Sequence, residues 1–272
     1  CLRLKNLSVK TSLYVIWPVA IAAPWALAAS VDAVPAILLP SPAAVAGAFV
    51  ELAKSGALLT HTLASGARAI AGFALAGATG IALGLWFSRA PRAEQASHVV
   101  LECLRVTPPL AMIPLLILWF GIGEAPKIAI VFLSGFFPIY LNTLTAFRSV
   151  DGKLLEVGAS LDFSREEMFR LIMLPAAMPG ILTGLRLGFG YSWRALVGAE
   201  LIAASSGLGY LINESGEYLK TDCVFAGIIT IAVLGIVADW LLAKILHAAM
   251  PSLKLPRTMP TPMLSRVDVK DR

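Results

Sequence analysis

Long runs of residues without a charged side chain constrain this chain most. Four such runs, each of 18 to 21 residues, cover 11–31, 69–88, 106–123 and 128–147. An α-helix needs about 20 mostly apolar residues to cross the hydrocarbon core of a bilayer. Only 14% of the 272 residues are charged, against roughly a quarter in soluble domains. The sequence therefore predicts an integral membrane protein.

Two more apolar stretches carry isolated charges and raise the number of predicted spans to six. Residues 176–203 include Arg186, Arg194 and Glu200, and residues 223–246 include Asp239. The predicted fold class is an all-α integral membrane protein. It has a short lead, a six-helix transmembrane domain and a basic tail that we expect to be disordered, at 1–11, 12–250 and 251–272. The predicted helices cover 12–30, 63–88, 97–121, 126–147, 176–203 and 223–246, and a short surface helix covers 43–56.

The basic residues lie mainly on one side of this topology. With the N-terminus in the cytoplasm, 15 of the 22 Lys and Arg residues fall on the cytoplasmic side and three fall outside. Basic loops tend to stay in the cytoplasm, so we expect both termini there. The net charge of +5 reflects this topology and not nucleic-acid binding, because no basic stripe with interleaved aromatic residues is present.

Small residues recur every four positions in two of the predicted helices. Such spacing lets helix backbones approach closely in a membrane, where burial of apolar area gives little driving force. The pattern predicts tight helix packing at Gly72, Gly80 and Gly84, and at Gly180, Gly184 and Gly188.

Prolines interrupt the predicted helix 97–121. Pro108, Pro109 and Pro114 each remove a backbone hydrogen bond, which a membrane tolerates where the freed carbonyls find partners or line a cavity. With Arg105 at one end, this helix is a candidate lining of a substrate path. The alternative is a kinked packing helix whose Arg105 reaches the membrane interface.

The charges inside 176–203 need partners or water. Arg186 and Glu200 are 14 residues apart, about 21 Å along a helix, so they cannot pair within one helix. A charge inside a membrane costs several kcal/mol unless it is paired or solvated. Arginines suit a small anion and tryptophans an apolar wall; the alternatives are pairing with Glu102 or Glu200, and an interfacial aromatic belt. The candidate path residues are Arg105, Pro109, Trp119, Asn142, Arg186, Trp193 and Glu200.

The charged segment 151–175 interrupts the apolar runs. Apolar residues at helical spacing over 154–161 predict a first amphipathic helix. Ser164 followed by Glu167 forms a capping box that predicts a second helix from Arg165. We expect Pro175 to end this second helix and to start the next span. The result is a helix–turn–helix on the inner membrane surface, suited to a groove on a soluble partner.

The same segment resembles the cytoplasmic motif of importer permeases of the ATP-binding-cassette class, E-A-A-x-x-x-G followed by nine residues and I-x-L-P. Glu156 fills the first position, Val157 and Gly158 stand for the alanines, and 172–175 close the motif with Ile, Met, Leu and Pro. Asp162 stands where this family almost always has glycine. Strings such as "PPLAMIPLLILWFGIGEAPK" and "GAELIAASSGLGYLI" extend the resemblance over roughly 35–250. They are closest to permeases for aliphatic sulfonates and taurine, with nitrate and bicarbonate permeases as near relatives.

The resemblance implies a type I importer permease in a bacterial inner membrane, with two copies of the chain forming the path. Two ATPase subunits would bind segment 151–175, an outer binding protein would deliver a small anion, and ATP and Mg would bind the partner ATPase. The chain itself has no G-x-x-x-x-G-K-[ST] loop, so we expect a transport subunit without ATPase activity, cofactor or metal. The implied coupling residues are Glu156, Val157, Gly158, Leu161, Asp162, Phe169, Leu174 and Pro175.

Three alternatives follow from the same residues. A nitrate, bicarbonate or other small-anion importer would share most of these strings. A stand-alone secondary carrier would use Glu200, Arg186 and Arg105 as coupling groups, and it predicts an inverted internal repeat that we do not find in the sequence. A purely structural membrane partner would not need broken helices or buried charges. The scattered cysteines and histidines have no metal-ligand spacing.

Overall fold

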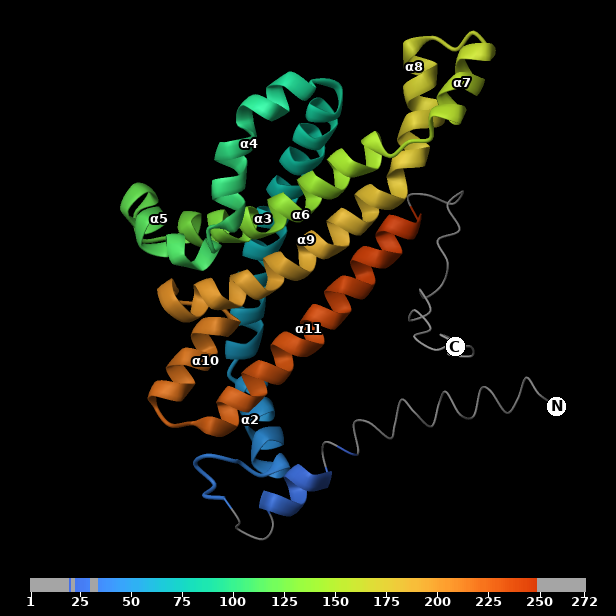
Figure 1. Ribbon diagram of the computed structural model, residues 1–272. Helices are drawn as coiled ribbons and strands as arrows, with labels where there is room; N and C mark the ends of the chain where they lie inside the picture. Colours follow the sequence, from blue (N-terminus) through green and yellow to red (C-terminus); the bar gives the residue numbers. More distant parts are fainter. Residues whose placement is uncertain (1–19, 21–22, 30–33, 249–272) are drawn as a thin grey trace, which may run out of the picture.

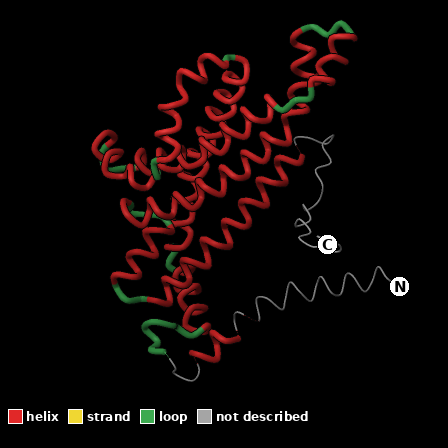
Figure 2. The backbone as a smooth tube through the Cα atoms, in the orientation of Figure 1, coloured by secondary structure: helices red, strands yellow, loops and turns green. Residues whose placement is uncertain are grey.

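The computed structural model describes residues 20, 23–29 and 34–248, which form helices joined by loops and contain no β-strand (Figures 1 and 2). The predicted lead 1–11 and tail 251–272 lie outside the described residues. The elements are α2 (Pro42–Lys54), α3 (Ala57–Arg89), α4 (Pro91–Val106), η1 (Pro109–Met112), α5 (Ile113–Phe120), α6 (Glu124–Arg148), α7 (Gly152–Ser160), α8 (Arg165–Glu167), η2 (Met168–Met173), α9 (Leu174–Ala203), α10 (Leu208–Glu217) and α11 (Thr221–Ala248).

Four described helices are long and apolar enough to cross a membrane: Ala57–Arg89, Glu124–Arg148, Arg165–Ala203 and Thr221–Leu246. A fifth span results when α4 and Pro109–Phe120 are counted together as one broken helix. The all-α membrane fold is therefore confirmed. The first of the six predicted spans, 12–30, falls largely outside the described residues.

The central helix is α6, because α3 and α9 both pack closely against it. An added Cβ at any of the six predicted packing glycines would lie 2.5–3.0 Å from an α6 side-chain atom. Val131 and Ile139 of α6 are 0% exposed. Since a glycine has no side chain to hold the helices apart, the three backbones touch and form one rigid unit. The glycines are Gly72, Gly80 and Gly84 of α3 and Gly180, Gly184 and Gly188 of α9.

The proline-rich span is bent more sharply than a kinked helix would be. The axes of α4 and of Pro109–Phe120 differ by 91°. Thr107 and Pro108 both have extended backbone, with ψ of 122° and 125°. Each of them precedes a proline, and the ring of the following proline disfavours the helical conformation. The segment after Pro109 therefore turns away from α4 and packs at the side of the bundle, against α6 and α9 (Figure 1).

The prediction that Pro175 ends a helix is wrong, because the chain stays helical from Arg165 to Ala203. The six residues of η2 form a π-helix, in which the Leu174 N–H donates to the Phe169 carbonyl five residues earlier. Pro175 then occupies the first turn of α9, where its missing N–H costs little. The register change absorbs the proline, so α8, η2 and α9 are continuous.

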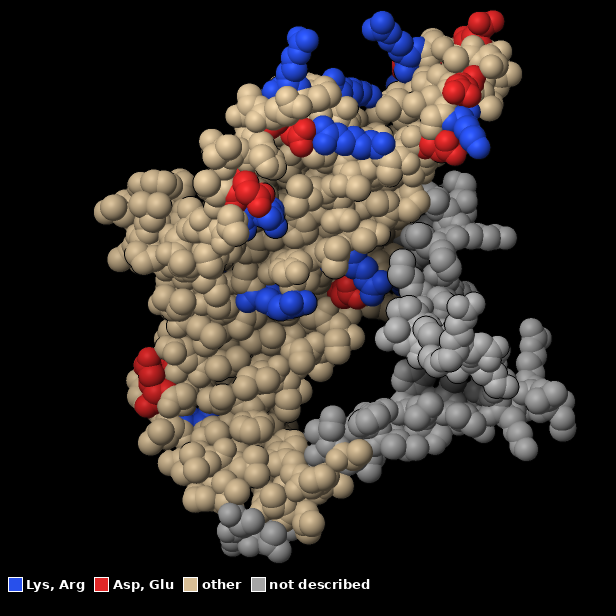
Figure 3. All heavy atoms as spheres, in the orientation of Figure 1, with Lys and Arg blue, Asp and Glu red and all other residues tan. Residues whose placement is uncertain are grey.

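The two ends of the bundle differ in shape and charge. One end carries α7 and α8, and we call it the hairpin end; the opposite end carries α2 and α10 and is called the α10 end (Figure 1). Charged side chains gather over the hairpin end in Figure 3, whereas the flank between the ends is mostly uncharged with a few separate charged groups. α11 lies along the outside and packs against α2 through Ala226, Val45 and Ala48.

Candidate functional site

The first candidate site is the hairpin formed by Gly152–Met173, which projects from the bundle (Figure 1). Its two arms are α7 and the continuous pair α8 and η2. They meet at Gly158, which is buried; an added Cβ there would lie 2.6 Å from Ile172 Cδ1 and 2.7 Å from Met168 Cε. Gly158 therefore allows the two arms to pack against each other.

Local hydrogen bonds set the turn of the hairpin. The Phe163 N–H donates to the Gly158 carbonyl (3.0 Å) and the Asp162 N–H donates to the Ala159 carbonyl (3.1 Å). These two bonds form a Schellman motif, which requires a left-handed residue after the helix. Asp162 has a φ of +56° and fills that position. The resemblance assigned a glycine to this position, and the left-handed φ explains why glycine suits it.

The second arm begins with the predicted capping box. Ser164 Oγ accepts from the Glu167 N–H (3.2 Å), and the Glu167 carboxylate accepts from the Ser164 N–H (2.8 Å). The two bonds satisfy backbone donors that a helix start leaves free. The helix start at Arg165 that the sequence predicts is confirmed.

Aromatic contacts fasten the hairpin to the bundle. The Phe169 ring stacks on Phe147 of α6 with centroids 6.0 Å apart, and the Arg89 guanidinium lies 4.5 Å from the Phe169 centroid. Leu174 packs against the buried cluster that contains Phe147 and Ala177. The base of the hairpin is thus held by α3, α6 and α9 together.

The tip of the hairpin exposes apolar side chains. Val157 is 55% exposed and Leu161 is 61% exposed, and Leu154 and Leu171, further down the two arms, are exposed as well. Glu156 is exposed beside them. Apolar side chains gathered on a projecting element typically mark a site of protein or membrane contact. Among the described residues, nothing covers this face of the hairpin.

The second candidate site is a hollow of about 660 Å³ on the flank, bounded by α4, η1, α6 and α9. We call it the lateral hollow. Its polar lining comprises Arg105, Thr107, Ser134, Tyr191 and Arg194, and its apolar lining includes Leu104, Leu110, Leu133, Phe137 and Leu141. An apolar wall with a few polar groups is the usual composition of a small-molecule site.

Two of the predicted path residues, Arg105 and Pro109, line the lateral hollow. Arg105 is paired with Glu102 on the same helix. Its Nε donates to Glu102 Oε2 (2.9 Å), and its Nη2 donates to Glu102 Oε1. Asn142 lies one residue beyond the lining and donates to the Pro138 carbonyl (2.8 Å). The pairing with Glu102 leaves Arg105 with its charge compensated.

The other four path candidates lie elsewhere. Arg186 of α9 pairs with Asp239 of α11 (2.7 Å). Trp193 packs toward α11, where its Nε1 would meet an added Cβ at Gly235 at 2.7 Å. Trp119 is 63% exposed on α5. Neither these three residues nor Glu200, the fourth, lines the lateral hollow.

Glu200 belongs to a buried ion cluster that the sequence did not reveal. It is 1% exposed and accepts from Arg68 of α3 (2.6 Å), from Ser65 Oγ (2.8 Å) and from the Gly209 N–H (3.0 Å). Arg68, 3% exposed, also forms two bonds to Glu124. The cluster ties α3, α6 and α9 to the start of α10. We assign it to holding the α10 end together, since Glu200 has no contact with the lateral hollow.

Gly207 and Gly209 make room for this cluster. Gly207 has a φ of +116°, and an added Cβ would lie 2.4 Å from the Glu200 carboxyl carbon. An added Cβ at Gly209 would lie 2.6 Å from Glu200 Cβ. The glycines of "SSGLG" are therefore explained by close approach to a buried carboxylate. Nearby on α10, a hydrogen bond to Glu214 raises the pKa of Tyr210.

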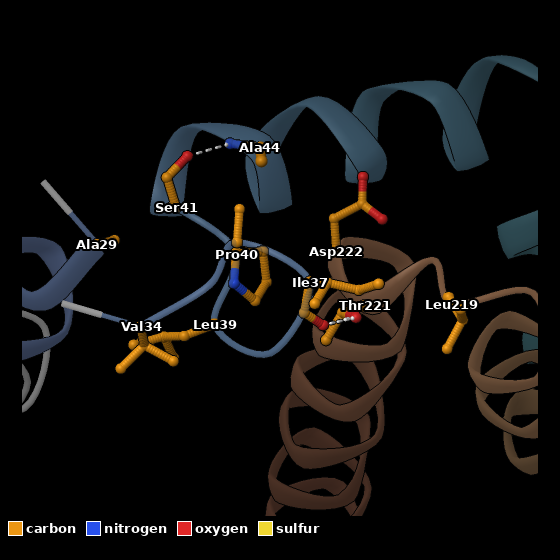
Figure 4. A pocket seen from close by; sticks show the side chains of 11 residues that line it. Ala29, Val34, Ile37, Leu39, Pro40, Ser41, Ala44, Leu219, Thr221 and Asp222 are labelled. Atoms are coloured by element: carbon orange, nitrogen blue, oxygen red, sulfur yellow. Dashed lines mark hydrogen bonds between the residues drawn. The ribbon is translucent and has the colours of Figure 1, made fainter. Parts of the chain in front are cut away.

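A smaller hollow of about 370 Å³ lies at the α10 end (Figure 4). The loop before α2 and the turn before α11 form it, and Thr221 Oγ1 donates to the Ile37 carbonyl across its wall. None of the predicted path residues lines it. Among the described residues no group of three His, Cys, Asp or Glu side chains could hold a metal ion.

The sequence missed Arg194, Tyr191 and Ser134 of the lateral hollow. Arg194 lies eight residues after Arg186 on α9, roughly 80° around the helix. Which of the two arginines faces the hollow depends on how α9 is rotated against α6. Gly180, Gly184 and Gly188 mark the face of α9 that packs against α6. Their spacing was therefore the sequence signal that could have shown which arginine faces the hollow.

This chain is similar in sequence to known membrane transport proteins. Residues 76–249 match the model of the binding-protein-dependent transport system inner membrane component family. Two proteins named "Putative aliphatic sulfonates transport permease protein SsuC", from Bacillus subtilis and Escherichia coli, are 41% and 43% identical over 222 residues. These matches cover 82% of this chain and 80% and 84% of the relatives. The Taurine transport system permease protein TauC of Escherichia coli is 36% identical over 220 residues, 79% of this chain and 80% of the relative.

The fold matches a solved structure of an amino acid ABC transporter with histidines at a TM-score of 0.55. That match has 15% sequence identity and covers 75% of this chain and 98% of the other. At this identity the match concerns the fold alone. The family match covers more than half of the chain, and the relatives align over most of their own length. The chain is a member of the binding-protein-dependent transport system inner membrane component family, a multi-pass membrane permease.

Proposed function

We propose that this chain is the transmembrane subunit of an ATP-driven importer for small organic anions, aliphatic sulfonates or taurine foremost. The observation that carries the proposal is the hairpin: an exposed apolar tip on a rigid base that is continuous with a membrane-spanning helix. The names of the relatives, sulfonate and taurine permeases, support the substrate class. Nitrate or bicarbonate is the alternative substrate.

The hairpin is the docking element for an ATPase subunit. Its exposed tip, with Val157 and Leu161, gains stability when a soluble partner covers it, because burial of apolar area is worth about 25 cal/mol per Å². Glu156 beside this tip offers a charge for orientation. ATP and Mg bind the partner, since this sequence has no phosphate-binding loop.

Movement of the docked ATPase reaches the membrane through α9. Because η2 joins α8 to α9 without a break, a displacement of the hairpin acts directly on that helix. The packing glycines bind α9 to α6 and α6 to α3, so these three helices move as one body. Closure of two ATPase subunits would therefore reorient two such bodies, one from each copy of a homodimer, and alternately open the path to either side.

The arrangement also gives the proposed orientation. The hairpin end carries the basic loops and faces the cytoplasm of a bacterial inner membrane, as charge asymmetry favours. The α10 end then faces outward, where a substrate-binding protein delivers the anion. Both chain termini would lie in the cytoplasm.

The test is ATP hydrolysis by the chain co-purified with its ATPase in lipid discs. Binding protein loaded with taurine, a longer alkanesulfonate, nitrate or bicarbonate is added in turn. We expect stimulation by a sulfonate-loaded form. Failure of any ATPase to co-purify would contradict the docking role, and stimulation by nitrate or bicarbonate alone would replace the substrate.

A matched pair of variants tests the hairpin itself. Glu156→Ala removes the exposed carboxylate at the tip and should abolish stimulation while the chain still inserts into the membrane. Glu217→Ala removes an exposed carboxylate from α10, at the opposite end, and should leave ATPase binding intact. Normal stimulation of the Glu156 variant would overturn the role of this residue.

A further inference from the structure

Arg194 lacks the carboxylate partner that four other arginines of the bundle have. Arg68, Arg105, Arg148 and Arg186 each pair with a carboxylate. For Arg194 no carboxylate lies within ion-pair distance among the described residues; its contact is the Tyr191 ring, with the guanidinium carbon 5.5 Å from the centroid. The guanidinium therefore keeps an uncompensated positive charge.

This charge lies within a membrane span and borders the lateral hollow. Inside a bilayer an unpaired charge costs several kcal/mol unless it faces water or a counter-ion. Arg194 is exposed, so the hollow provides that surrounding. Arg105 also lines the hollow, but its charge is compensated by Glu102 and adds much less to the field.

The hollow also holds polar groups without an internal partner. Ser134 Oγ is a buried hydroxyl oxygen with no hydrogen bond among the described residues. Pro138, four residues later in α6, has no N–H to donate to the Ser134 carbonyl. These groups leave the α6 wall of the hollow with unpaired polar atoms. The exposed Arg194 guanidinium is the donor that an oxyanion in the hollow can reach.

The remaining wall of the hollow is apolar. Leu104, Leu110, Leu133, Phe137 and Leu141 supply it. These side chains suit an alkyl chain, and they offer nothing to a small inorganic anion. The hollow thus combines one unpaired cation with an aliphatic and aromatic surface.

We infer that Arg194, supported by Tyr191, is the anion contact of the lateral hollow, and that the hollow takes an oxyanion head group with a short alkyl tail. The inference deepens the proposed function and rests on it. It names the residue that the substrate charge meets and the wall that its tail meets. It also transfers this role from Arg105 and Arg186, whose charges are already paired.

The first test measures the field of Arg194 without any transport. Thr107→Cys places a thiol in the hollow, in a chain whose three native cysteines are replaced by serine. The rates of labelling by anionic 2-sulfonatoethyl methanethiosulfonate and by its cationic trimethylammonium analogue are compared. Arg194→Gln should lower the anionic-to-cationic rate ratio by about fivefold or more. A change of less than about twofold would overturn the inference.

The matched control is Lys244→Gln. Lys244 also lies over an aromatic ring, with Nζ 3.8 Å from the Trp240 centroid, and it does not line the hollow. Its removal changes the net charge equally and should leave the ratio unchanged. An equal effect of both substitutions would mean that the ratio reports total charge, and would contradict a local site.

A second measurement leaves Arg194 in place, so it does not depend on the folding of the variant. 1-Butanesulfonate should slow labelling of Thr107→Cys by the uncharged methyl methanethiosulfonate. Butyltrimethylammonium has the same tail and the opposite charge, and it should not slow labelling. Equal protection by both, or protection by neither, would overturn the inference; the latter includes a hollow already filled by a second copy of the chain.

Uptake by the complete transporter then separates this inference from the proposed function. Arg194→Gln should reduce butanesulfonate uptake per ATP hydrolysed by about tenfold, as loss of one charge-assisted hydrogen bond predicts. Arg194→Lys should retain more uptake than Arg194→Gln. Uptake by Arg194→Gln within about twofold of the wild type would refute the inference. If the wild-type complex shows no stimulated hydrolysis, the proposed function fails while both labelling results still decide on the hollow.

Discussion

Glu200 offers the sharpest test of how the α10 end is held together. Its carboxylate accepts from Arg68, Ser65 and the Gly209 N–H, at 2.6, 2.8 and 3.0 Å, and its side chain is 0% exposed. Glu200→Gln replaces one acceptor oxygen by an NH2 donor. Because all three partners are donors, at least one bond is lost and two donors then face each other.

The magnitude follows from these contacts. A hydrogen bond to a charged group contributes about 1.5–3 kcal/mol, and an unsatisfied buried donor costs about 1–3 kcal/mol. Arg68 keeps its bonds to Glu124, so the loss stays below the about 3–5 kcal/mol of a buried ion that loses its only partner. We expect Glu200→Gln to lower the free energy of unfolding by about 2–4 kcal/mol.

The assay is the apparent melting temperature of the purified chain in detergent. About 2–4 °C per kcal/mol for a chain of this size predicts a fall of at least about 4 °C. Glu166→Gln is the control, since it neutralises the exposed pair with Arg170 on the hairpin, and exposed pairs contribute about 0–1 kcal/mol. A fall for Glu200→Gln no larger than that for Glu166→Gln would refute the reasoning.

Three other substitutions test the hairpin and the helix packing. Asp162→Gly should stabilise the turn by about 0.5–1 kcal/mol, because glycine adopts the left-handed φ of +56° without strain; a lower melting temperature would show that the Asp162 side chain makes a necessary contact. Gly184→Leu should prevent folding, because its Cβ alone would lie 2.7 Å from Asn142 Cβ and 3.3 Å from the backbone of Ile139; a normal monodisperse peak in size-exclusion chromatography would contradict the packing. Phe169→Ala should lower binding-protein-stimulated ATP hydrolysis more than basal hydrolysis, since it removes the stack on Phe147; equal effects on both rates would argue against a coupling role.

The hairpin was predictable because its signals are local in sequence. The Ser164–Glu167 capping box spans four residues, and the apolar spacing of α7 spans two turns. The left-handed turn at Asp162 followed from a resemblance that calls for glycine at this position. What the sequence did not give was the continuity of the second arm with α9, since Pro175 normally favours a helix start and the π-helix before it has no clear signature.

The buried ion cluster shows what local reasoning misses. Arg68 and Glu200 are 132 residues apart, and the sequence contains no spacing that would join them. Pairing was expected for Arg186 or Glu200, but its partners depend on which faces α3, α9 and α11 present to one another. The same geometry decided that Arg194 and not Arg186 borders the lateral hollow.

The bend after α4 was only partly predictable from the sequence. Pro108 and Pro109 predicted an interruption, and the sequence correctly placed Arg105 beside it. The angle of 91° results from two successive extended residues, and it depends on the surface that α5 meets. The prolines thus indicate where the span breaks and not how far it turns.

The most direct test of the central claim is the amount of ATPase that co-purifies with the chain. Val157→Asp places a charge on the hairpin tip, at a side chain that is 55% exposed. Ile122→Asp places the same charge before α6, at a side chain that is 94% exposed, away from the hairpin. We expect wild type and Ile122→Asp to retain one ATPase per chain and Val157→Asp to lose it. Equal ATPase binding by all three chains, or binding by none, would contradict the hairpin as the docking element.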